Sequence, residues 1–474
     1  MIKFGTGGWR AIIGDGFTRE NVEILAQAIS EDMLCACQEG ADDCRTKGIV
    51  IGYDRRFLSD IAAIWASSVF AANGIKVHFI SKIAPTPLIM FAVKTLGTKY
   101  GLAVTASHNP ALYNGIKVFT EGGRDAQAEV TAGFERIISK GVSVRTMDFE
   151  KGEDQGLITR TDFTNQYLDS IISMIDMDVI RKARLKVLLD PMFGVSKTSL
   201  QTILMTARCE VDIINDRHDT LFGGKLPSPS ASTLSKLREM VVTQKYDMGI
   251  GTDGDADRIG IIDDKGNFIH PNKIMVLLYY YLLKFKGWKG DVVRNVATTH
   301  VLDRIAAAYG MSCHEVPVGF KHISSKMEET DAVIGGESSG GLTIRGHIKG
   351  KDGIFAACLL VEMISVTGMK ISQTLDQIGE LYGSAEMTEF DTSFSQEKKN
   401  ELFTRLFVSK EIPDFGKDIE RVDYTDGCKI YFKDDSWIIA RFSGTEPLMR
   451  IFCETESEEH SAELTGIWRR SLGL

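Results

Sequence analysis

The sequence lacks a long hydrophobic run. None of its apolar stretches reaches the ~18–20 residues that a membrane-spanning helix needs. The nearest candidate, residues 275–283, is short and contains three tyrosines. The N-terminal segment carries Lys3, Arg10 and Asp15 and has no apolar core of the kind found in signal peptides. We therefore expect a cytoplasmic protein with no membrane partner.

Paired cysteine motifs and an excess of positive charge are also absent. The eight cysteines are scattered, with no Cys-x-x-Cys pair, so neither a disulfide framework nor a cysteine zinc site is indicated. The formal charge of −9 disfavours broad binding to nucleic acid, although a local basic pocket for an anion stays possible. We expect small-molecule partners and no nucleic acid, and the sequence does not indicate an oligomeric state.

One strand–helix–strand pattern occurs three times. The units begin at residues 49, 185 and 291, and their central helices are predicted over 60–73, 196–207 and 299–309. Two β-rich runs joined by one helix favour a parallel strand pair with a right-handed crossover. The 474 residues suggest about three domains, or four if they are small. We predict three similar α/β domains with mixed sheets.

The C-terminal region has a different pattern. Helical segments are predicted over 374–381 and 396–407, followed by alternating runs at 428–432 and 437–442 that aspartate-rich turns separate. These features predict antiparallel hairpins in a smaller α+β domain. The predicted domains are 1–155, 156–262, 263–370 and 371–474.

Three aspartates alternate after the strand-like residues 246–250. Asp253, Asp255 and Asp257 lie so close together that their negative charges require a compensating cation. Oxygen ligands suit a hard ion such as Mg²⁺, and the neighbouring Arg258 suits a site for phosphate and metal together. A Mg²⁺ site is the best interpretation, and a solvated acidic turn is the simplest alternative.

Two known motifs also partly match this segment. An EF-hand loop would require Gly at the position of Arg258 and Glu at the position of Asp264. Gly249, Gly251 and Gly254 fit the dinucleotide fingerprint, but the intervening aspartates would repel a pyrophosphate.

A serine follows the strand-like residues 100–104. Ser107 is succeeded by His108 and an Asn-Pro turn, which places its hydroxyl on a sharply turned loop. Adjacent Ser and His residues rarely act as a nucleophile and base, so a plain turn is the alternative. Lys117, shortly downstream, could return to the same pocket.

A glycine-rich segment spans residues 335–341. It matches the hydrolase pattern G-x-S-x-G with Ser338 at its centre, but neither downstream histidine lies in a triad context. Glu337 and Ser339 on such a loop would suit hydrogen bonds to sugar hydroxyls.

The segment from Arg441 to Arg450 combines two arginines, hydroxyl side chains and a glycine turn. Such groups form a phosphate cradle without a P-loop, and no P-loop motif occurs in the chain. A structural hairpin turn is the alternative.

These four segments, in this order, resemble the α-D-phosphohexomutase superfamily of phosphoglucomutases and phosphomannomutases. The opening residues 5–10 also resemble the N-terminal loop of that superfamily. The resemblance covers essentially the whole chain. It implies three α/β domains and a C-terminal α+β domain of TATA-binding-protein-like form around a central cleft.

The resemblance also implies roles for individual residues. Ser107 would be the phosphorylated serine, Lys117 would assist proton transfer, and Arg258 would lie near the transferring phosphoryl group. The candidate catalytic residues are Ser107, His108, Lys117, Arg258 and Lys351. The candidate substrate-binding residues are Arg10, Lys321, Glu337, Ser339, Arg441, Ser443, Gly444, Thr445 and Arg450. The candidate Mg²⁺ ligands are Ser107, Asp253, Asp255 and Asp257.

Two segments indicate the branch of the superfamily. Residues 318–321 and 347–353 resemble the phosphoglucomutase and phosphopentomutase branches. Phosphomannomutases and phosphoglucosamine mutases usually have His where Gly341 lies, and Lys351 is the local acid–base candidate instead. The implied reaction interconverts glucose 1-phosphate and glucose 6-phosphate through a phosphoserine, with Mg²⁺ as cofactor and glucose 1,6-bisphosphate as activator and intermediate.

Several alternatives to this reaction stay open. Within the superfamily they are phosphomannomutase and phosphopentomutase. Outside it they are a dinucleotide-dependent oxidoreductase and a non-catalytic sugar-phosphate binding protein.

Overall fold

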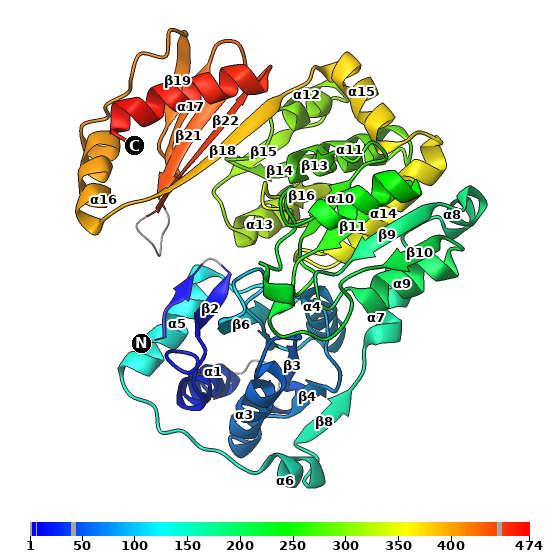
Figure 1. The fold of residues 1–474 in the computed structure, drawn as a ribbon. Helices are drawn as coiled ribbons and strands as arrows, with labels where there is room; N and C mark the ends of the chain where they lie inside the picture. Colours follow the sequence, from blue (N-terminus) through cyan, green and yellow to red (C-terminus); the bar gives the residue numbers. More distant parts are fainter. Residues whose placement is uncertain (1, 6, 39–43, 443–447) are drawn as a thin grey trace.

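The computed structural model describes residues 2–5, 7–38, 44–442 and 448–474. The chain forms four β-sheets in succession, coloured from blue to red in Figure 1. The first three sheets are mixed and carry helices, and the fourth is antiparallel. The prediction of three α/β domains and a C-terminal α+β domain is confirmed.

The first three sheets share one strand order. In each, the first strand lies between two parallel neighbours, and a fourth strand runs antiparallel beside the third. The three sets, in chain order, are β3 (Ile49–Tyr53), β4 (Val77–Ile80), β5 (Tyr100–Val104), β6 (Tyr113–Thr120); β9 (Lys186–Asp190), β10 (Glu210–Ile213), β11 (Met248–Thr252), β12 (Ile259–Ile262); and β14 (Val292–Asn295), β15 (Cys313–Val316), β16 (Ile334–Gly336), β17 (Leu342–Ile344).

The crossover helices lie where the sequence predicted them. They are α3 (Ser59–Ala72), α9 (Lys197–Thr206) and α12 (Val301–Ala308). The central strands are nearly all buried, as expected for parallel sheets covered by helices on their faces, whereas the edge strands β10 and β15 are partly exposed. The ends of β5, β11 and β16 lead into the Ser107, aspartate and Glu337 segments, respectively.

The N-terminal domain extends its sheet on both sides. The added strands are β1 (Phe4–Gly5), β2 (Gly8–Ile12), β7 (Arg124–Asp125) and β8 (Ile158–Thr161). Its other helices are α1 (Arg19–Gln38), α2 (Cys44–Lys47), α4 (Thr86–Leu96), α5 (Ala128–Ser139) and α6 (Phe149–Asp154).

The second and third domains share one hydrophobic core, to which α4 of the first domain also contributes. The apolar helix α14 (Gly353–Thr367) packs against α8 (Met177–Ala183), α9 and α11 (Pro271–Lys284). The remaining elements of this part are α7 (Thr164–Ile172), η1 (Phe222–Gly224), α10 (Ser235–Gln244), β13 (Phe268–Ile269), α13 (Phe320–Thr330) and α15 (Ile371–Tyr382).

No single helix within the described residues is long and apolar enough to cross a membrane. Together, α14 and α15 reach that length and composition, but they bend by 79° relative to each other and α14 is buried.

The C-terminal domain is a five-stranded antiparallel sheet in the order β18-β22-β21-β20-β19. One face packs against α17, and the other contributes Trp437 and Phe452 to a cluster with Val296 of the third domain. Its elements are β18 (Glu386–Ser393), α16 (Gln396–Phe403), the π-helix η2 (Thr404–Val408), β19 (Ile419–Asp423), β20 (Cys428–Phe432), β21 (Trp437–Phe442), β22 (Leu448–Thr455) and α17 (Glu458–Leu472).

Strand pairing bears on two of the domain boundaries. β8 pairs with β4 of the first sheet, although it lies beyond the expected boundary at residue 155. β13 pairs with β12 of the second sheet, beyond the expected boundary at residue 262. We therefore propose that the first domain ends after β8 and the second after β13.

A cluster of charges joins the third and C-terminal domains. Glu315 on β15 accepts from Lys429 Nζ at 2.6 Å and from Arg294 at 2.5 Å, and Tyr431 also donates to it. Burial and Arg294 lower the pKa of Lys429 to about 7. Burial alone would raise the pKa of Glu315, but His300, Lys429 and Arg294 outweigh it and hold that pKa below its usual range. Glu315 therefore compensates the charge of Arg294, and that of Lys429 when it is protonated, across the interface.

Replacing Glu315 by Gln is expected to lower the free energy of unfolding by about 3 kcal/mol, because two cations would lose their shared carboxylate. Urea denaturation followed by circular dichroism measures this change. Glu386→Gln is the control, since the pair between Glu386 and Lys273 spans the same two domains but is exposed. Equal losses in both variants would contradict the importance of burial.

Candidate functional site

Ser107 lies in the loop between β5 and β6. It is 1% exposed and has a positive φ of 53°, which is uncommon for a residue other than glycine. Its backbone N–H donates to Thr105 Oγ1 at 2.8 Å, and Thr105 donates to Asp54 Oδ2 at 2.6 Å. Its own hydroxyl donates to Asp253 Oδ2 at 2.8 Å. The strained loop therefore aims the serine oxygen at the aspartate segment of the second domain.

Arg56 fixes the backbone of the same loop. Its guanidinium donates to four backbone carbonyls, those of Ser107, Asn109, Pro110 and Tyr113, at 2.6–3.1 Å. The side chain is buried beside Asp54. The sequence analysis did not select Arg56. Its signal was a charged run directly after β3, at the edge of the sheet where α/β proteins bind ligands.

The three aspartates follow β11, and all are buried. One carboxylate oxygen from each of them lies within 4.8 Å of the other two. Gly254 between them permits a close approach to the serine loop, because a Cβ atom there would lie 2.7 Å from the Ser107 carbonyl oxygen. The predicted cluster of Ser107, Asp253, Asp255 and Asp257 is therefore present as one spatial group.

Cations from three domains surround these carboxylates. Lys117 Nζ lies 2.6 Å from Asp255 Oδ2 and 2.6 Å from Asp257 Oδ2. Lys351 Nζ lies 3.1 Å from Asp257 Oδ2, and Arg258 Nε lies 3.8 Å from Asp257 Oδ1. These three positive charges compensate charges that could not otherwise be buried.

The neighbouring charges shift the pKa values in opposite directions. Burial and repulsion from the other two aspartates raise the pKa of Asp253 well above its usual range. Burial also disfavours ionised Asp257, but Lys117 and Lys351 outweigh it and hold that pKa well below its usual range. Burial lowers the pKa of Lys117, but Asp255 and Asp257 reverse this effect and raise it overall. The three aspartates therefore differ in how readily they bind a proton.

The donor set fits a hard divalent cation. Asp255 Oδ1 and Asp257 Oδ1 are buried and accept no hydrogen bond, which is costly for a carboxylate oxygen unless a ligand satisfies it. With Asp253 and Ser107 they offer only oxygen atoms, the ligands that Mg²⁺ prefers. The buried triad is thus consistent with the predicted Mg²⁺ site.

His108 and two arginines lie beside the serine. His108 Nδ1 is 3.4 Å from Ser107 Oγ. Arg258, then burial, then Arg10 lower the pKa of His108 well below its usual range, so its ring is neutral at neutral pH. Arg10 donates to Asn109 Oδ1 at 2.6 Å, and the buried Nε atoms of Arg10 and Arg258 have no hydrogen-bond partner. The predicted residues Arg10, His108 and Arg258 are therefore close to Ser107.

The glycine-rich segment of the third domain has one buried and one exposed candidate. Glu337 is buried and accepts from the backbone N–H of Gly319 at 2.9 Å, whereas Ser339 is exposed. Gly341 leaves room for Lys351, because a Cβ atom at Gly341 would lie 2.2 Å from Lys351 Cδ. The missing side chain at Gly341 therefore permits Lys351 to reach Asp257.

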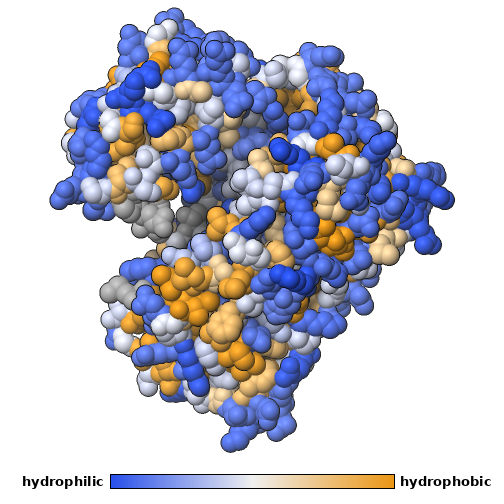
Figure 2. All heavy atoms as spheres, in the orientation of Figure 1, coloured by the Kyte–Doolittle hydropathy of each residue, from blue (hydrophilic) through white to orange (hydrophobic). Residues whose placement is uncertain are grey.

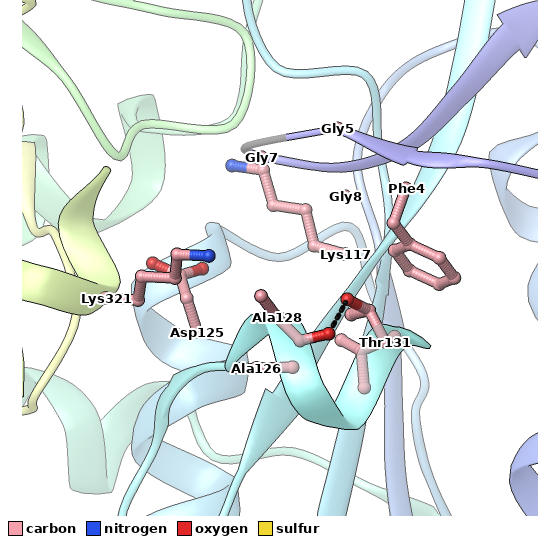
Figure 3. A pocket seen from close by; sticks show the side chains of 11 residues that line it. Phe4, Gly5, Gly7, Gly8, Lys117, Asp125, Ala126, Ala128, Thr131 and Lys321 are labelled. Carbon is pink, nitrogen blue, oxygen red and sulfur yellow. Dashed lines mark hydrogen bonds between the residues drawn. The ribbon is translucent and has the colours of Figure 1, made fainter. Parts of the chain in front are cut away.

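A cavity of about 270 Å³ lies between the first and third domains. Its wall includes Lys117 and Asp125 from the first domain and Lys321 from α13, as Figure 3 shows. In the space-filling view the surface is hollowed between the N-terminal and C-terminal domains (Figure 2). Lys321 is thus placed at the same cleft as Lys117.

The C-terminal candidates are only partly described. Arg441 and Arg450 face each other in the register of β21 and β22. Arg441 donates to Asp426 Oδ1 at 2.8 Å, and Asp426 Oδ2 accepts from the backbone N–H of Val318 at 2.6 Å. Arg450 is exposed and donates to Asp391 at 3.2 Å. Ser443, Gly444 and Thr445, and Thr6 of the N-terminal loop, lie outside the described residues.

The glycines of the dinucleotide fingerprint have another role. Gly249 and Gly251 lie within β11, where a Cβ atom would lie 2.8 Å from Val241 or 2.7 Å from Leu234. They therefore permit α10 to pack closely on the strand.

Comparison with known proteins gives the same four parts in the same order. Models of the phosphoglucomutase/phosphomannomutase family match residues 1–145 (alpha/beta/alpha domain I), 165–266 (domain II), 270–382 (domain III) and 396–466 (C-terminal domain). A phosphoglucomutase/phosphomannomutase of Thermococcus kodakarensis is 30% identical over 462 residues, which cover 97% of this chain and 96% of the relative. The chain belongs to the phosphoglucomutase/phosphomannomutase family. It is therefore a phosphohexomutase, an isomerase.

Other relatives of this phosphohexomutase have different names. A phosphoglucosamine/phosphogalactosamine mutase of Sulfurisphaera tokodaii is 30% identical over 463 residues, covering 96% of this chain and 95% of the relative. A crystal structure from Thermus thermophilus, provisionally assigned as a phosphomannomutase, superposes with a TM-score of 0.85 at 27% identity, covering 100% of this chain and 99% of that one. Relatives of similar identity thus carry names that refer to different sugars.

Adding Mg²⁺ is expected to raise the melting temperature of the phosphohexomutase, because a ligand at about 100 times its Kd stabilises the fold by about 2.7 kcal/mol. Asp255→Asn is expected to lose most of this shift in differential scanning fluorimetry. Asp154→Asn is the control, since Asp154 is exposed on α6. If Mg²⁺ raised the melting temperature of Asp255→Asn as much as that of wild type, the cation would bind at another site.

Proposed function

We propose that this phosphohexomutase interconverts glucose 1-phosphate and glucose 6-phosphate, with Ser107 as the phosphoryl carrier. The observation that carries the proposal is the contact between the buried Ser107 hydroxyl and Asp253, at the edge of three clustered carboxylates. A serine oxygen held there can exchange a phosphoryl group with a sugar hydroxyl, and the cationic side chains nearby attract the phosphate.

The proposed reaction has two balanced transfers. In the first, the bond between phosphorus and Ser107 Oγ breaks, a new bond forms to the free sugar hydroxyl, and the hydroxyl proton is returned to Ser107. The resulting glucose 1,6-bisphosphate then turns around in the cleft. In the second, Ser107 Oγ takes the phosphoryl group from the opposite end, and its proton passes to the sugar oxygen.

The residues of this chain hold the reacting groups in these steps. His108 Nδ1, 3.4 Å from Ser107 Oγ, is placed to accept or return the serine proton. Lys117 or Lys351 supplies a proton donor on the sugar side, and Arg10 and Arg258 attract the phosphoryl oxygens. Mg²⁺ bound by Asp253, Asp255, Asp257 and the serine phosphate would neutralise negative charge on the transferring group.

Two further groups bind the rest of the sugar phosphate in this proposal. Glu337, Ser339 and Lys321 contact the sugar. The cradle of Arg441, Ser443, Gly444, Thr445 and Arg450 holds the phosphate that is not reacting. This assignment rests on the family resemblance of these segments, and the position of Arg441 beside residues 318–321 supports it.

The preference for glucose rests on two segments and on one absent side chain. Residues 318–321 and 347–353 resemble phosphoglucomutases and phosphopentomutases, and Gly341 lies where phosphomannomutases and phosphoglucosamine mutases usually have His. Phosphomannomutase and phosphopentomutase are the alternatives. Curated relatives named phosphoglucosamine mutases add glucosamine phosphates to the sugars that must be tested.

Mass spectrometry of the purified protein is expected to find phosphate on Ser107. Ser107→Ala should lower turnover at least about a thousandfold, because the covalent route needs this oxygen. Ser139→Ala, at an exposed serine that ends α5, should remain fully active. Robust turnover by Ser107→Ala would reject the phosphoserine route.

A panel of sugar 1-phosphates tests the substrate. With a trace of glucose 1,6-bisphosphate, we expect kcat/KM for glucose 1-phosphate to exceed the values for mannose, glucosamine and ribose 1-phosphates by at least about tenfold, as expected when differing polar groups are recognised. A coupled assay for each 6-phosphate or 5-phosphate product measures this ratio. A higher kcat/KM for another sugar 1-phosphate would assign the enzyme to the branch of the family that acts on that sugar.

A further inference from the structure

Asp125 is an acidic residue of the cleft to which the proposed reaction gives no role. It forms β7 with Arg124 and pairs in register with Phe119 of β6. It lines the same cavity as Lys117 and Lys321, and Figure 3 shows its carboxylate on the side of the cavity where the Lys321 ammonium lies. Its charge interacts with those of Lys351, Lys117, Asp257 and Glu337. Asp125 is therefore part of the central cleft.

The backbone around Asp125 is fixed by contacts between the first and third domains. Arg124 Nη2 donates to Glu328 Oε2 at 2.6 Å, and Gln127 Nε2 donates to Ser325 Oγ at 3.1 Å. Both acceptors lie on α13, the helix that also carries Lys321. The backbone at Asp125, on the two-residue strand β7, is consequently held beside α13.

The Asp125 carboxylate has no donor among the described residues. It forms no hydrogen bond with them and no ion pair within 4.0 Å, although Asp253, Asp255, Asp257 and Glu337 all accept at least one hydrogen bond. Burial raises its pKa, which is the expected effect on a carboxylate without close partners. A ligand with a hydrogen-bond donor would satisfy it.

The chemistry of the ligand limits which part can meet Asp125. A phosphate is anionic and would be repelled by a carboxylate. The sugar ring between the phosphates is neutral and carries hydroxyl groups, each of which can donate a hydrogen bond. A carboxylate that accepts from one hydroxyl also disfavours an analogue without it, because the acceptor then loses that partner.

We propose that Asp125 is a specificity-determining residue that accepts a hydrogen bond from one ring hydroxyl of the hexose phosphate. The inference rests on the proposed function, because it requires that a hexose phosphate occupies the cleft. Asp125 then selects sugars with a free donor at that ring position.

Substrates lacking single hydroxyls test this role. The values of kcat/KM are measured for glucose 6-phosphate and for its 2-deoxy, 3-deoxy and 4-deoxy analogues, with wild type and Asp125→Ala. We expect wild type to lose about tenfold to a hundredfold with the analogue that lacks the contacted hydroxyl, as for a hydrogen bond to a charged group. Asp125→Ala should lower kcat/KM for glucose 6-phosphate by a similar factor, mainly by raising KM. For the sensitive analogue, which already lacks the contacted hydroxyl, Asp125→Ala should have the same kcat/KM as wild type.

Two further variants complete the design. Asp125→Asn keeps the shape of the side chain and should show the same loss of discrimination to a smaller degree, so it replaces Asp125→Ala if that variant is poorly folded. Glu121→Ala is the matched control, because Glu121 is an exposed acid in the turn before β7. It should discriminate among the analogues as wild type does.

Each result decides the proposal. If both Asp125 variants discriminate among all analogues as wild type does, or lose the same factor with every substrate, Asp125 is not a specificity residue. If wild type shows no single sensitive hydroxyl, the contact does not exist. If wild type turns over no hexose phosphate at all, the proposed function itself fails, and this inference fails with it.

Discussion

Charge balance in the centre of the molecule is the constraint on which the rest of the structure depends. Three buried aspartates from one loop could not be removed from water alone, since each would carry an uncompensated charge. They are buried because Lys117 comes from the first domain, Arg258 from the second and Lys351 from the third. The centre is therefore complete only when three separate sheets are packed together.

The shared strand order explains how three domains meet this constraint. In each mixed sheet the third strand leads into a loop that reaches the centre, namely the loops of Ser107, Asp253 and Glu337. One topology, repeated three times, thus brings a buried serine, a carboxylate cluster and a buried glutamate to the centre. The antiparallel fourth domain is attached through buried charges and aromatic side chains at Glu315 and Trp437.

Local sequence patterns predicted the elements, and motif spacing predicted much of the site. The helix predicted over 60–73 is α3, and the alternating aspartates form one buried cluster, because both depend on residues close in the chain. Arg56 was missed because the carbonyl groups that it binds belong to a distant loop, and Asp125 because the cavity that it lines is formed together with a residue of another domain. The two expected boundaries at 155 and 262 lie before β8 and β13, because a short strand pairs with whichever sheet edge is available.

Gly341 and Lys351 have a consequence for how relatives of this enzyme can diverge. In the observed rotamer, the stem of Lys351 occupies the space that a side chain at position 341 would need. The two positions are therefore epistatic: introducing a ring at 341 is tolerated only after the lysine stem has been shortened or redirected. A lineage that moves from one arrangement to the other must change both residues. A side chain introduced at 341 first would collide with the Lys351 stem, and a shortened residue 351 would first leave that space unfilled.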